Sequence, residues 1–429
     1  RGARLIVDGA LLTNLCPSAW PGIQVWGNPN LDQPDPASNP GNATIAGIVR
    51  IINNATIQHA GTAISTGAWA LGGAGWQYVG GVVYAENSNF INNKRAVEFL
   101  SYKFSNKSKF INSLFTEPDG WAGNSVGVTI WDCNGIVFNR NRFLNLDVAG
   151  IYGIDFGAII VDHNQFRNLT TGIESYNTQF YKGNLEIGSE AFTPNYFKNN
   201  RRHIFCSSTT GLDKVNIINN DLFDAQKNGI ILDGSSYYNV SKNRFMNTPL
   251  AMSSTASGFD GNFIRCNTFQ SHTNGIKFEA YNEQTQFLDN CIESTVNTGI
   301  VLNVGTEIRD EQGGAGRPAG NCLQSTLDIS TNNSLSFTYF VTPQPSITHC
   351  TPTDNNCQRP TNNLSDGGSN NYFLGNGNWN GPNGCGSGGG DGLAPPTIVI
   401  ARNLETSALL AWQQNPGDLS LKKIYNEMK

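Results

Sequence analysis

The sequence predicts an all-β protein, a right-handed parallel β-helix of about eleven coils followed by a loop-rich tail and a short C-terminal helical segment. A unit of nearly constant length recurs along the chain, and each unit has a large apolar anchor near its middle. The anchors Phe223, Phe245, Phe269 and Ile292 are 22, 24 and 23 residues apart, and the unit extends back to Phe143. Such a period is typical of solenoids, in which no unit buries its apolar side alone and stacked neighbours supply the stability.

Four rows of similar residues align when the units are stacked on their anchors. The row five residues before the anchor is apolar and comprises Phe138, Val161, Phe192, Ile218, Val240, Ile264 and Phe287. The row two residues before the anchor is Asn except for Asp221, and the row two residues after it is mostly Asn or Ser. The fourth row usually follows Gly and comprises Ile151, Ile173, Ile204, Ile230, Met252, Ile276 and Ile300. Rows that keep their register over seven units favour a β-helix over a β-sandwich.

The Asn rows are expected at the corners between strands. Asn tolerates the left-handed backbone conformation of a tight corner, and stacked amides can hydrogen-bond from one coil to the next. Between the corners, short runs such as residues 229–232 have apolar residues at alternate positions, which indicates strands. We therefore predict a structural ladder formed by Asn141, Asn164, Asn195, Asn243, Asn267 and Asn290.

The repeat divides the chain into four segments. Residues 1–305 carry the pattern and are assigned to the β-helix, and residues 306–342 are predicted to form terminal coils or a cap. Residues 343–396 are rich in Gly, Pro and Asn and are predicted to be a linker. Residues 397–429 are predicted to form a short helical segment, the start of a truncated region. The chain also opens without Met, in a strand-like run at Arg4, so we expect a processed or truncated piece of a longer precursor.

Composition and charge exclude several classes of partner. Only 14% of the residues are charged, the formal net charge is −5, and no basic run occurs. Neither nucleic acid nor an anionic membrane is therefore expected as a partner. An uninterrupted apolar run of about 18 residues, which a membrane-spanning helix would need, is also absent from the sequence.

The cysteines do not indicate a metal site or another reactive centre. The number of cysteines, nine, is odd. Cys350 and Cys357 stand close together in a predicted loop and could form a disulfide, as could Cys322 or Cys385. Four others fall in different rows and need not pair: Cys133, Cys206, Cys266 and Cys291. Neither a C-x-x-C spacing for zinc nor a Ca²⁺-binding nonapeptide repeat occurs, so no cofactor is predicted, with Ca²⁺ left open but unsupported.

Large secreted β-helix proteins of the Bacteroidota resemble this chain. The resemblance lies in the runs from Gly9 to Thr13 and from Trp20 to Gly27, and in repeated Asn-x-Phe-x-Asn corners followed by Gly-Ile. It covers roughly residues 1–305 and implies the same fold. It also implies export to the cell surface, and many members end in a type IX secretion sorting domain, which is not found in this sequence. These proteins share no catalytic motif, so the resemblance assigns no active-site residue.

Carbohydrate-active β-helices share the predicted fold and place their carboxylates on the outside of one sheet. The outward position three residues past the Ile row holds Asp233 and Glu279, two coils and therefore roughly 10 Å apart. Their side chains could approach the separation of an inverting hydrolase, although outward carboxylates are usually just solvated. The five histidines occupy different rows and are expected at exposed corners. Asp233 and Glu279 are therefore the only catalytic candidates, and weak ones.

Aromatic residues suggest binding rather than catalysis. Trp69, Trp76 and Trp121 stand in Gly-rich insertions, and Tyr176 and Tyr181 flank another insertion. Such rings suit the faces of sugars or a protein interface, and they equally suit local packing over the solenoid. We interpret these five residues as candidate ligand-binding positions.

The sequence as a whole favours a non-enzymatic protein of the extracellular space or the outer bacterial surface, with an adhesive or structural, assembly-forming role. Its expected partners are polysaccharides or other surface proteins. The alternative is a polysaccharide lyase or glycoside hydrolase with a groove on the Gly-Ile sheet.

Overall fold

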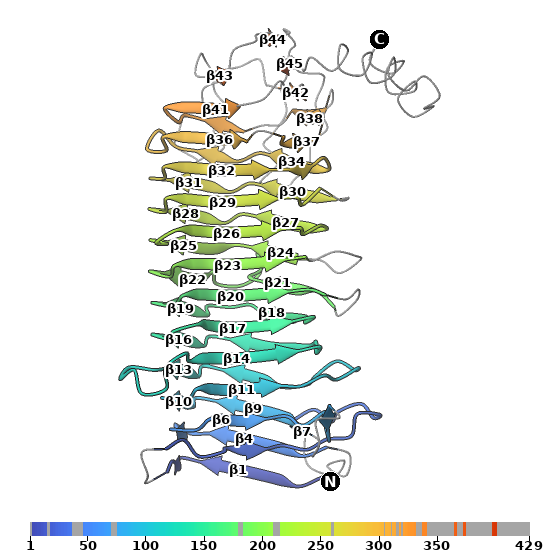
Figure 1. The fold of residues 1–429 in the computed structure, drawn as a ribbon, viewed down its shortest axis with the longest axis vertical. Helices are drawn as coiled ribbons and strands as arrows, with labels where there is room; N and C mark the ends of the chain where they lie inside the picture. The colour runs from blue at the N-terminus through green and yellow to red at the C-terminus, as the bar shows by residue number, and fades with distance from the viewer. Residues whose placement is uncertain are drawn as a thin grey trace.

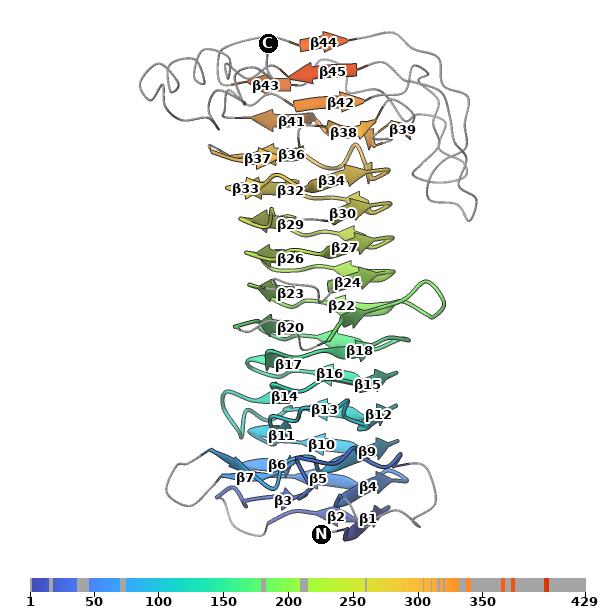
Figure 2. The ribbon, with the colours of Figure 1, turned by 90° about the vertical axis from the view of Figure 1, so that its right-hand side faces the viewer.

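The computed structural model is a rod of stacked β coils, in which each coil contributes one strand to each of three long parallel sheets (Figure 1 and Figure 2). Segments about 23 residues apart in the chain therefore lie side by side. The structure describes residues 2–14, 18–36, 46–69, 75–178, 183–208, 215–258, 261–303, 305–309, 311–314, 317–318, 321–331, 337–340, 364–366, 372–374 and 397–400.

Three sheets, named sheet 1, sheet 2 and sheet 3, form the walls of the rod within the described residues. Sheet 1 has 11 strands: β1 (Arg4–Asp8), β4 (Ile48–Ile52), β9 (Val82–Glu86), β12 (Lys109–Ile111), β15 (Ile136–Asn139), β18 (Ala158–Ile160), β21 (Leu185–Ile187), β24 (Val215–Ile218), β27 (Tyr238–Ser241), β30 (Asn262–Arg265) and β34 (Thr285–Leu288). Sheet 2 has 12 strands: β2 (Leu11–Leu12), β5 (Thr56–Gln58), β10 (Asn89–Ile91), β13 (Leu114–Thr116), β16 (Arg142–Leu144), β19 (Gln165–Arg167), β22 (Asn195–Lys198), β25 (Asn220–Phe223), β28 (Arg244–Met246), β31 (Thr268–Gln270), β35 (Cys291–Ile292) and β40 (Cys322–Leu323). Sheet 3 has 13 strands: β3 (Ile23–Gln24), β6 (Thr62–Ser65), β11 (Arg95–Phe99), β14 (Val126–Trp131), β17 (Ala149–Ile154), β20 (Thr171–Tyr176), β23 (Arg202–Ser207), β26 (Asn228–Asp233), β29 (Leu250–Thr255), β32 (Asn274–Glu279), β36 (Thr298–Leu302), β41 (Leu327–Thr331) and β43 (Leu364–Asp366).

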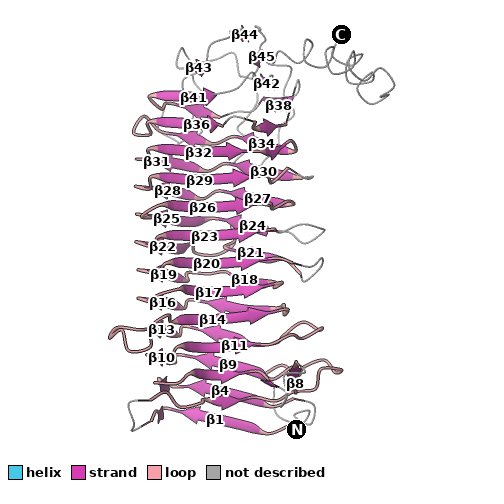
Figure 3. Cartoon of the chain, in the orientation of Figure 1, coloured by secondary structure: helices cyan, strands magenta, loops and turns pink. Residues whose placement is uncertain are grey.

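Smaller sheets decorate the rod. An antiparallel hairpin joins β7 (Ala68–Trp69) to β8 (Trp76–Gln77), and a parallel pair joins β33 (Tyr281–Asn282) to β37 (Glu307–Ile308). A five-stranded sheet contains β39 (Arg317–Pro318), β38 (Glu311–Gly314), β42 (Phe337–Phe340), β45 (Thr397–Ile400) and β44 (Tyr372–Leu374). Figure 3 shows strands and loops, with no helix in the part of the chain that is described. Those residues accordingly include no helix long and apolar enough to cross a membrane.

The predicted fold class, a right-handed parallel β-helix, is confirmed. Eleven coils contribute to all three sheets, because every strand of sheet 1 has a counterpart in sheet 2 and in sheet 3. The interior is lined mainly by apolar side chains, and its most regular feature is a stack of phenylalanine rings in sheet 2. Centroids of successive rings lie 4.6–4.8 Å apart from Phe90 through Phe115, Phe143, Phe166 and Phe197, and again between Phe245 and Phe269.

The register differs from the prediction in the irregular coils. Leu222, and not Phe223, is the inward anchor that pairs with Phe197 and Phe245. In the row five residues before the anchor, Ile160 and Ile217 occupy the interior in place of Val161 and Ile218, a shift of one residue, and Ile187 takes the place of Phe192, which lies further along the chain. Phe192 is 51% exposed, because it belongs to the insertion that lengthens its coil. A strand residue has to point inward or outward, so a one-residue slip reverses every side chain of the strand.

The Asn side chains of the predicted ladder line the inside of the corner between sheet 1 and sheet 2. Each amide nitrogen donates to the amide oxygen of the next coil at 2.9–3.1 Å, from Asn141 through Asn164 and Asn195, and then from Asn243 through Asn267 to Asn290. Asn220 joins the two parts, accepting from Asn195 and donating to Asn243, so the predicted row was wrong to place Asp221 there. All of these amides are buried.

The second Asn row is exposed and adopts the left-handed conformation expected at corners. Backbone φ angles of 54–58° occur at Asn145, Asn168, Asn199, Asp224, Asn247 and Ser271. Asp224, not Ala225, continues this row, which again corrects the register by one residue. The two rows therefore have different tasks: the buried row satisfies backbone groups, and the exposed row turns the chain.

The C-terminal segments differ in part from the prediction. Strands β40 and β41 continue sheets 2 and 3 in the segment predicted to hold terminal coils. Strands β43 and β44 fall within the predicted linker, and Thr397–Ile400 forms strand β45 where a helical segment was predicted. Residues 401–429, together with Cys350 and Cys357, lie outside the described residues. Cys266 and Cys291 were predicted to need no partner, but they are disulfide-bonded, as is Cys322, whereas Cys133 and Cys206 are buried thiols outside any disulfide.

Candidate functional site

The outer face of sheet 3 carries a cluster of aromatic and charged side chains. Strand alternation points every second residue of β14, β17, β20 and β23 outward, and the parallel register stacks these positions in two rows. One row contains Glu98, Thr129, Tyr152, Glu174 and Phe205, and the other contains Trp131, Ile154, Tyr176 and Ser207.

Four half-buried rings form a continuous band across these strands, which we call the aromatic band. The centroid of Trp131 lies 5.8 Å from that of Tyr152, Tyr152 lies 5.9 Å from Tyr176, and Tyr176 lies 5.3 Å from Phe205. The rings alternate between the two rows and are inclined to one another by 54–71°. Partly exposed rings with polar edges can contact a sugar by their faces and edges, so the band is a candidate ligand surface.

Charged groups flank the aromatic band, and each is paired within the site. The Arg95 guanidinium lies 2.7 Å from Glu98 Oε1, which also accepts a hydrogen bond from the Trp131 indole at 3.1 Å. Arg202 lies 3.4 Å from Glu174 Oε1, and its Cζ lies 4.8 Å from the Phe205 ring centroid. Two arginines therefore balance two glutamates, and the local net charge is close to zero.

Tyr176 connects the rings to the ion pairs. Its hydroxyl donates to Glu174 Oε1 at 2.7 Å. Burial, together with this hydrogen bond to a carboxylate, raises the pKa of Tyr176 to about 12. Burial and the Glu174 charge also raise the pKa of Tyr152. Both phenols consequently remain neutral hydrogen-bonding groups at neutral pH.

The weak catalytic candidates stand on the same face, further along the rod, and the structure does not bring them together. Asp233 and Glu279 belong to one row, with Thr255 between them. Glu279 contacts Lys277 at 2.5 Å and accepts a hydrogen bond from the Asn303 amide at 2.6 Å. The Glu279 carboxylate therefore already has a cation and a hydrogen-bond donor of the protein as partners. Their strands are two coil spacings apart, about 10 Å.

The remaining predicted ligand-binding residues are scattered. Trp69 and Trp76 pair across the β7–β8 hairpin, and Trp121 lies in the loop between β13 and β14. The Trp121 ring packs against His59, with centroids 4.9 Å apart. Tyr181 lies outside the described residues. Among these candidates, Tyr176 alone belongs to the aromatic band.

Two histidines contradict the prediction of exposed corners. His203 and His272 are buried, and burial lowers their pKa values to about 3 and about 4. Their Nδ1 atoms contact the Asn200 amide and the Thr248 carbonyl. Both rings are neutral packing elements of the core rather than bases facing a ligand.

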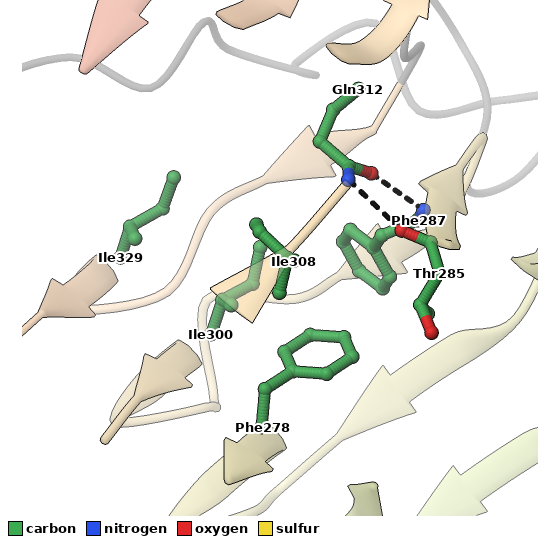
Figure 4. Close-up of a pocket in the computed structure, with 7 residues that line it drawn as sticks. All are labelled: Phe278, Thr285, Phe287, Ile300, Ile308, Gln312 and Ile329. Carbon is green, nitrogen blue, oxygen red and sulfur yellow. Dashed lines mark hydrogen bonds between the residues drawn. The ribbon is translucent and has the colours of Figure 1, made fainter. Parts of the chain in front are cut away.

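A small cavity lies near the C-terminal end of the solenoid (Figure 4). Its volume is about 10 Å³, and it is lined by Phe278, Thr285, Phe287, Ile300, Ile308, Gln312 and Ile329. The Gln312 amide crosses its wall, donating to the Thr285 carbonyl and accepting from the Phe287 amide. One water molecule would fill this space, so it is a packing gap and not a ligand site.

Sequence reasoning missed most of the site. Glu98, Trp131, Tyr152, Glu174, Arg202 and Phe205 were not singled out. Stacking the residue directly after the Ile row would have placed Tyr152, Glu174 and Phe205 in one line, because the same period governs inward and outward positions.

Comparison with known proteins adds one finding. A family model described as periplasmic copper-binding protein (NosD) matches residues 157–310, roughly a third of the chain. This family has a β-helix fold, in agreement with the structure. Neither the curated proteins nor the solved structures contain a match.

The family description raises the question of copper, which prefers histidine, cysteine and methionine ligands. Within the described residues, no three His, Cys, Asp or Glu side chains gather as a metal site would require. The Cys133 and Cys206 thiols are buried, and burial raises the pKa of the Cys206 thiol to about 12. The donors in this part of the chain do not fit copper, and we derive no chemistry through it.

Proposed function

We propose that this protein is a non-enzymatic β-helix rod of the extracytoplasmic space that binds glycans through the aromatic band on sheet 3. The single observation that carries the proposal is the run of four partly exposed rings on successive coils, Trp131, Tyr152, Tyr176 and Phe205. The extracytoplasmic setting is supported by the periplasmic description of the matched family. An adhesive role follows from a rod that presents such a surface.

The arrangement of carboxylates favours binding over turnover. Four carboxylates follow one another along the outer face of sheet 3: Glu98, Glu174, Asp233 and Glu279. Each is separated from the next by two coils or more. Glycosidases hold two carboxyl groups within about 5–9.5 Å across one bond, and two coils already span about 10 Å.

Asp132 and Asp155 lie on adjacent coils at the corner beyond these strands, but they cap turns. Asp132 accepts from the Ser101 hydroxyl, and both Asp155 oxygens accept from Thr178. These hydrogen bonds give both carboxylates a structural role at the corner.

The test is to measure affinity for a panel of neutral polysaccharides by affinity electrophoresis, before and after Trp131→Ala, Tyr152→Ala and Tyr176→Ala. Each substitution is expected to weaken binding by roughly 5- to 10-fold, the loss of one ring contact. Tyr84→Ala is the matched control. Tyr84 donates to Glu86 at 2.8 Å and lies beneath Arg50, so it has the same local partners on the outer face of sheet 1.

An equal loss in Tyr84→Ala, or no binding to any polysaccharide, would overturn the proposal. New reducing ends or unsaturated products would replace it with the enzymatic alternative, a lyase or glycoside hydrolase.

A further inference from the structure

A second face of the rod has a different electrostatic character. The outer face of sheet 2, from β16 to β28, presents Arg142, Arg167, Lys198 and Arg244 against two carboxylates. Both carboxylates are engaged: Asp221 lies 3.2 Å from Arg244, and Asp224 lies 3.4 Å from Lys198. Arg142 and Arg167 are left with no carboxylate within ion-pair distance among the described residues, although the chain as a whole carries a net charge of −5.

Arg167 is held in a fixed orientation with unmet hydrogen-bonding capacity. Its Cζ lies 4.8 Å from the centroid of Tyr196 on the next coil, so the guanidinium is stacked on the ring. The Nε atom is buried, so the edge that remains for a ligand is the one between the two terminal nitrogens. A stacked guanidinium keeps its planar N–H edge available for a carboxylate or sulfate, which it can bind with two parallel hydrogen bonds.

A polar groove adjoins this arginine. It runs over the corner between sheet 2 and sheet 3, has a volume of about 620 Å³, and is lined by Asn145, Leu146, Asp147, Asn168, Leu169, Thr170, Asn199, Arg201 and Gln226. Asn168 directly follows Arg167, and the exposed Arg201 also lacks an ion-pair partner in the described part of the chain. Asp147 lies two coils from Arg201. Its Oδ2 atom accepts a hydrogen bond from the Ser125 backbone amide at 3.4 Å.

The three unpaired guanidinia lie on three consecutive coils. Arg142 is in β16, Arg167 is two positions further along in β19, and Arg201 follows β22. Arg142 and Arg201 are therefore separated by two coil spacings, about 10 Å along the rod. Asn145, Asn168 and Asn199 stack along the rod at the corner that separates Arg142 and Arg167 from Arg201, and Gln226 lies one coil further on. The Asn168 amide donates to Asn145 at 2.9 Å, and the remaining donors and acceptors of these amides can meet hydroxyl groups.

We infer that this strip, consisting of Arg142, Arg167, Arg201 and the groove amides, binds an acidic glycan whose carboxylate or sulfate groups contact the guanidinia. Widely spaced cations alternating with amides match a polymer in which acidic groups alternate with hydroxyl-bearing rings. A densely charged polyanion would be repelled by the net negative chain and by Asp147. The strip is separate from the aromatic band, so this inference does not depend on the glycan bound there.

The experiment measures binding of the full chain to hyaluronan, whose carboxylate-bearing and neutral rings alternate, to a sparsely sulfated dextran and to neutral dextran at several NaCl concentrations. The triple variant Arg142→Gln, Arg167→Gln, Arg201→Gln is expected to lose at least 10-fold in affinity for one or both acidic polymers. It should also show a weaker salt dependence and unchanged binding to dextran. The two acidic polymers distinguish carboxylate from sulfate recognition. Tyr176→Ala should leave acidic-polymer binding unchanged, which separates this inference from the proposed function.

The matched control is the triple variant Arg140→Gln, Lys198→Gln, Arg244→Gln. All three cations are ion-paired, Arg140 with Asp162 at 2.8 Å, Lys198 with Asp224 at 3.4 Å and Arg244 with Asp221 at 3.2 Å, so the control removes the same charge from the same part of the rod. An equal loss in this control would overturn the inference, because net charge alone would then explain binding. Tighter binding to phosphatidylserine vesicles or to a single-stranded oligonucleotide, lost in the triple variant, would equally overturn the glycan assignment.

Discussion

His203 and Leu222 are matched in size. From β6 to β36, His203 is the one large side chain in an inward row of sheet 3 that is otherwise Ala63, Ala96, Gly127, Gly150, Gly172, Gly229, Ala251, Gly275 and Gly299, and the buried Asp328 follows in β41. In that row, a Cβ at Gly172 would meet the Phe197 ring of the next coil at 2.9 Å, and one at Gly229 would meet Phe245 at 3.1 Å. At His203 the corresponding residue of the next coil is Leu222, which interrupts the phenylalanine stack. The imidazole, 5.8 Å from the Phe197 ring, fills the space of the missing ring.

This relationship predicts strong coupling between the two positions. His203→Gly should cost about 2–4 kcal/mol through the cavity it leaves, and Leu222→Phe about 1–3 kcal/mol through overpacking. The double variant restores the pattern of the neighbouring coils, so its cost should fall at least about 1 kcal/mol below the sum of the single costs. Urea denaturation of the four proteins gives this coupling free energy. Gly229→His, which places an imidazole opposite an intact phenylalanine, is the control and should be the least stable of the set. Additive costs would contradict the size-matching explanation.

The buried histidines predict that stability falls in acid. The pKa values of His203 and His272 are about 3 and about 4 in the folded protein, against about 6.5 in the unfolded chain. Below pH 6.5 the two histidines are therefore protonated in the unfolded state but not in the folded state. The free energy of unfolding decreases as the pH falls, until the folded pKa values are reached. The loss is about 1.4 kcal/mol per pH unit for each histidine once the pH is well below 6.5.

Thermal unfolding at pH 7 and pH 4.5 checks this expectation by comparing the protein with His203→Gln and His272→Gln. The difference between the two pH values should be smaller in each variant. Asp328 acts in the opposite direction, because burial raises its pKa to about 6 and the folded state gains its proton first. A pH dependence unchanged by both substitutions would show that other groups control it.

The two Asn rows predict different costs at neighbouring positions. Asn164 is fully buried, donates to the Phe138 carbonyl at 2.9 Å and accepts from the Asn141 backbone amide at 3.0 Å. Asn164→Ala leaves these groups unsatisfied and should cost about 3 kcal/mol or more, since each lost partner costs about 1–3 kcal/mol. Asn168 is exposed with φ of 58°, so Asn168→Gly keeps the turn and should cost less than about 1 kcal/mol. Chemical denaturation measures both, and equal costs would contradict the separate roles of the rows.

The dispersed carboxylates predict that neutralising them leaves glycan binding intact. Asp233→Asn and Glu279→Gln should change affinity for a neutral polysaccharide by less than about 2-fold, because neither residue belongs to the aromatic band. Affinity electrophoresis with the panel used for Tyr176→Ala gives this comparison directly. Cleavage of any polysaccharide by the unmodified chain, abolished by either substitution, would instead show that the two carboxylates act together.

The β-helix architecture and the residues that line its interior could be predicted from the sequence alone. Every coil packs against its neighbours, so inward positions have to repeat, and the repeat is visible as the rows that contain Asn164, Phe166 and Ile173. The alternation of strand residues then defined which positions face outward. It therefore also determined that Tyr176 and Asp233 share a row, although not what surrounds either of them.

The register of the irregular coils and the side-chain contacts on the surface depend on three-dimensional packing, which the sequence does not show. The insertion around Phe192 and the choice of Leu222 over Phe223 depend on which alternative fills the core, and both local sequences offer an apolar residue one position away. Outward positions carry no such constraint, so Glu98 and Trp131 show no repeat, and their hydrogen bond joins residues 33 positions apart. Burial of His203 and the disulfide-bonded state of Cys291 likewise follow from three-dimensional packing, because side-chain type alone does not fix the environment of a residue.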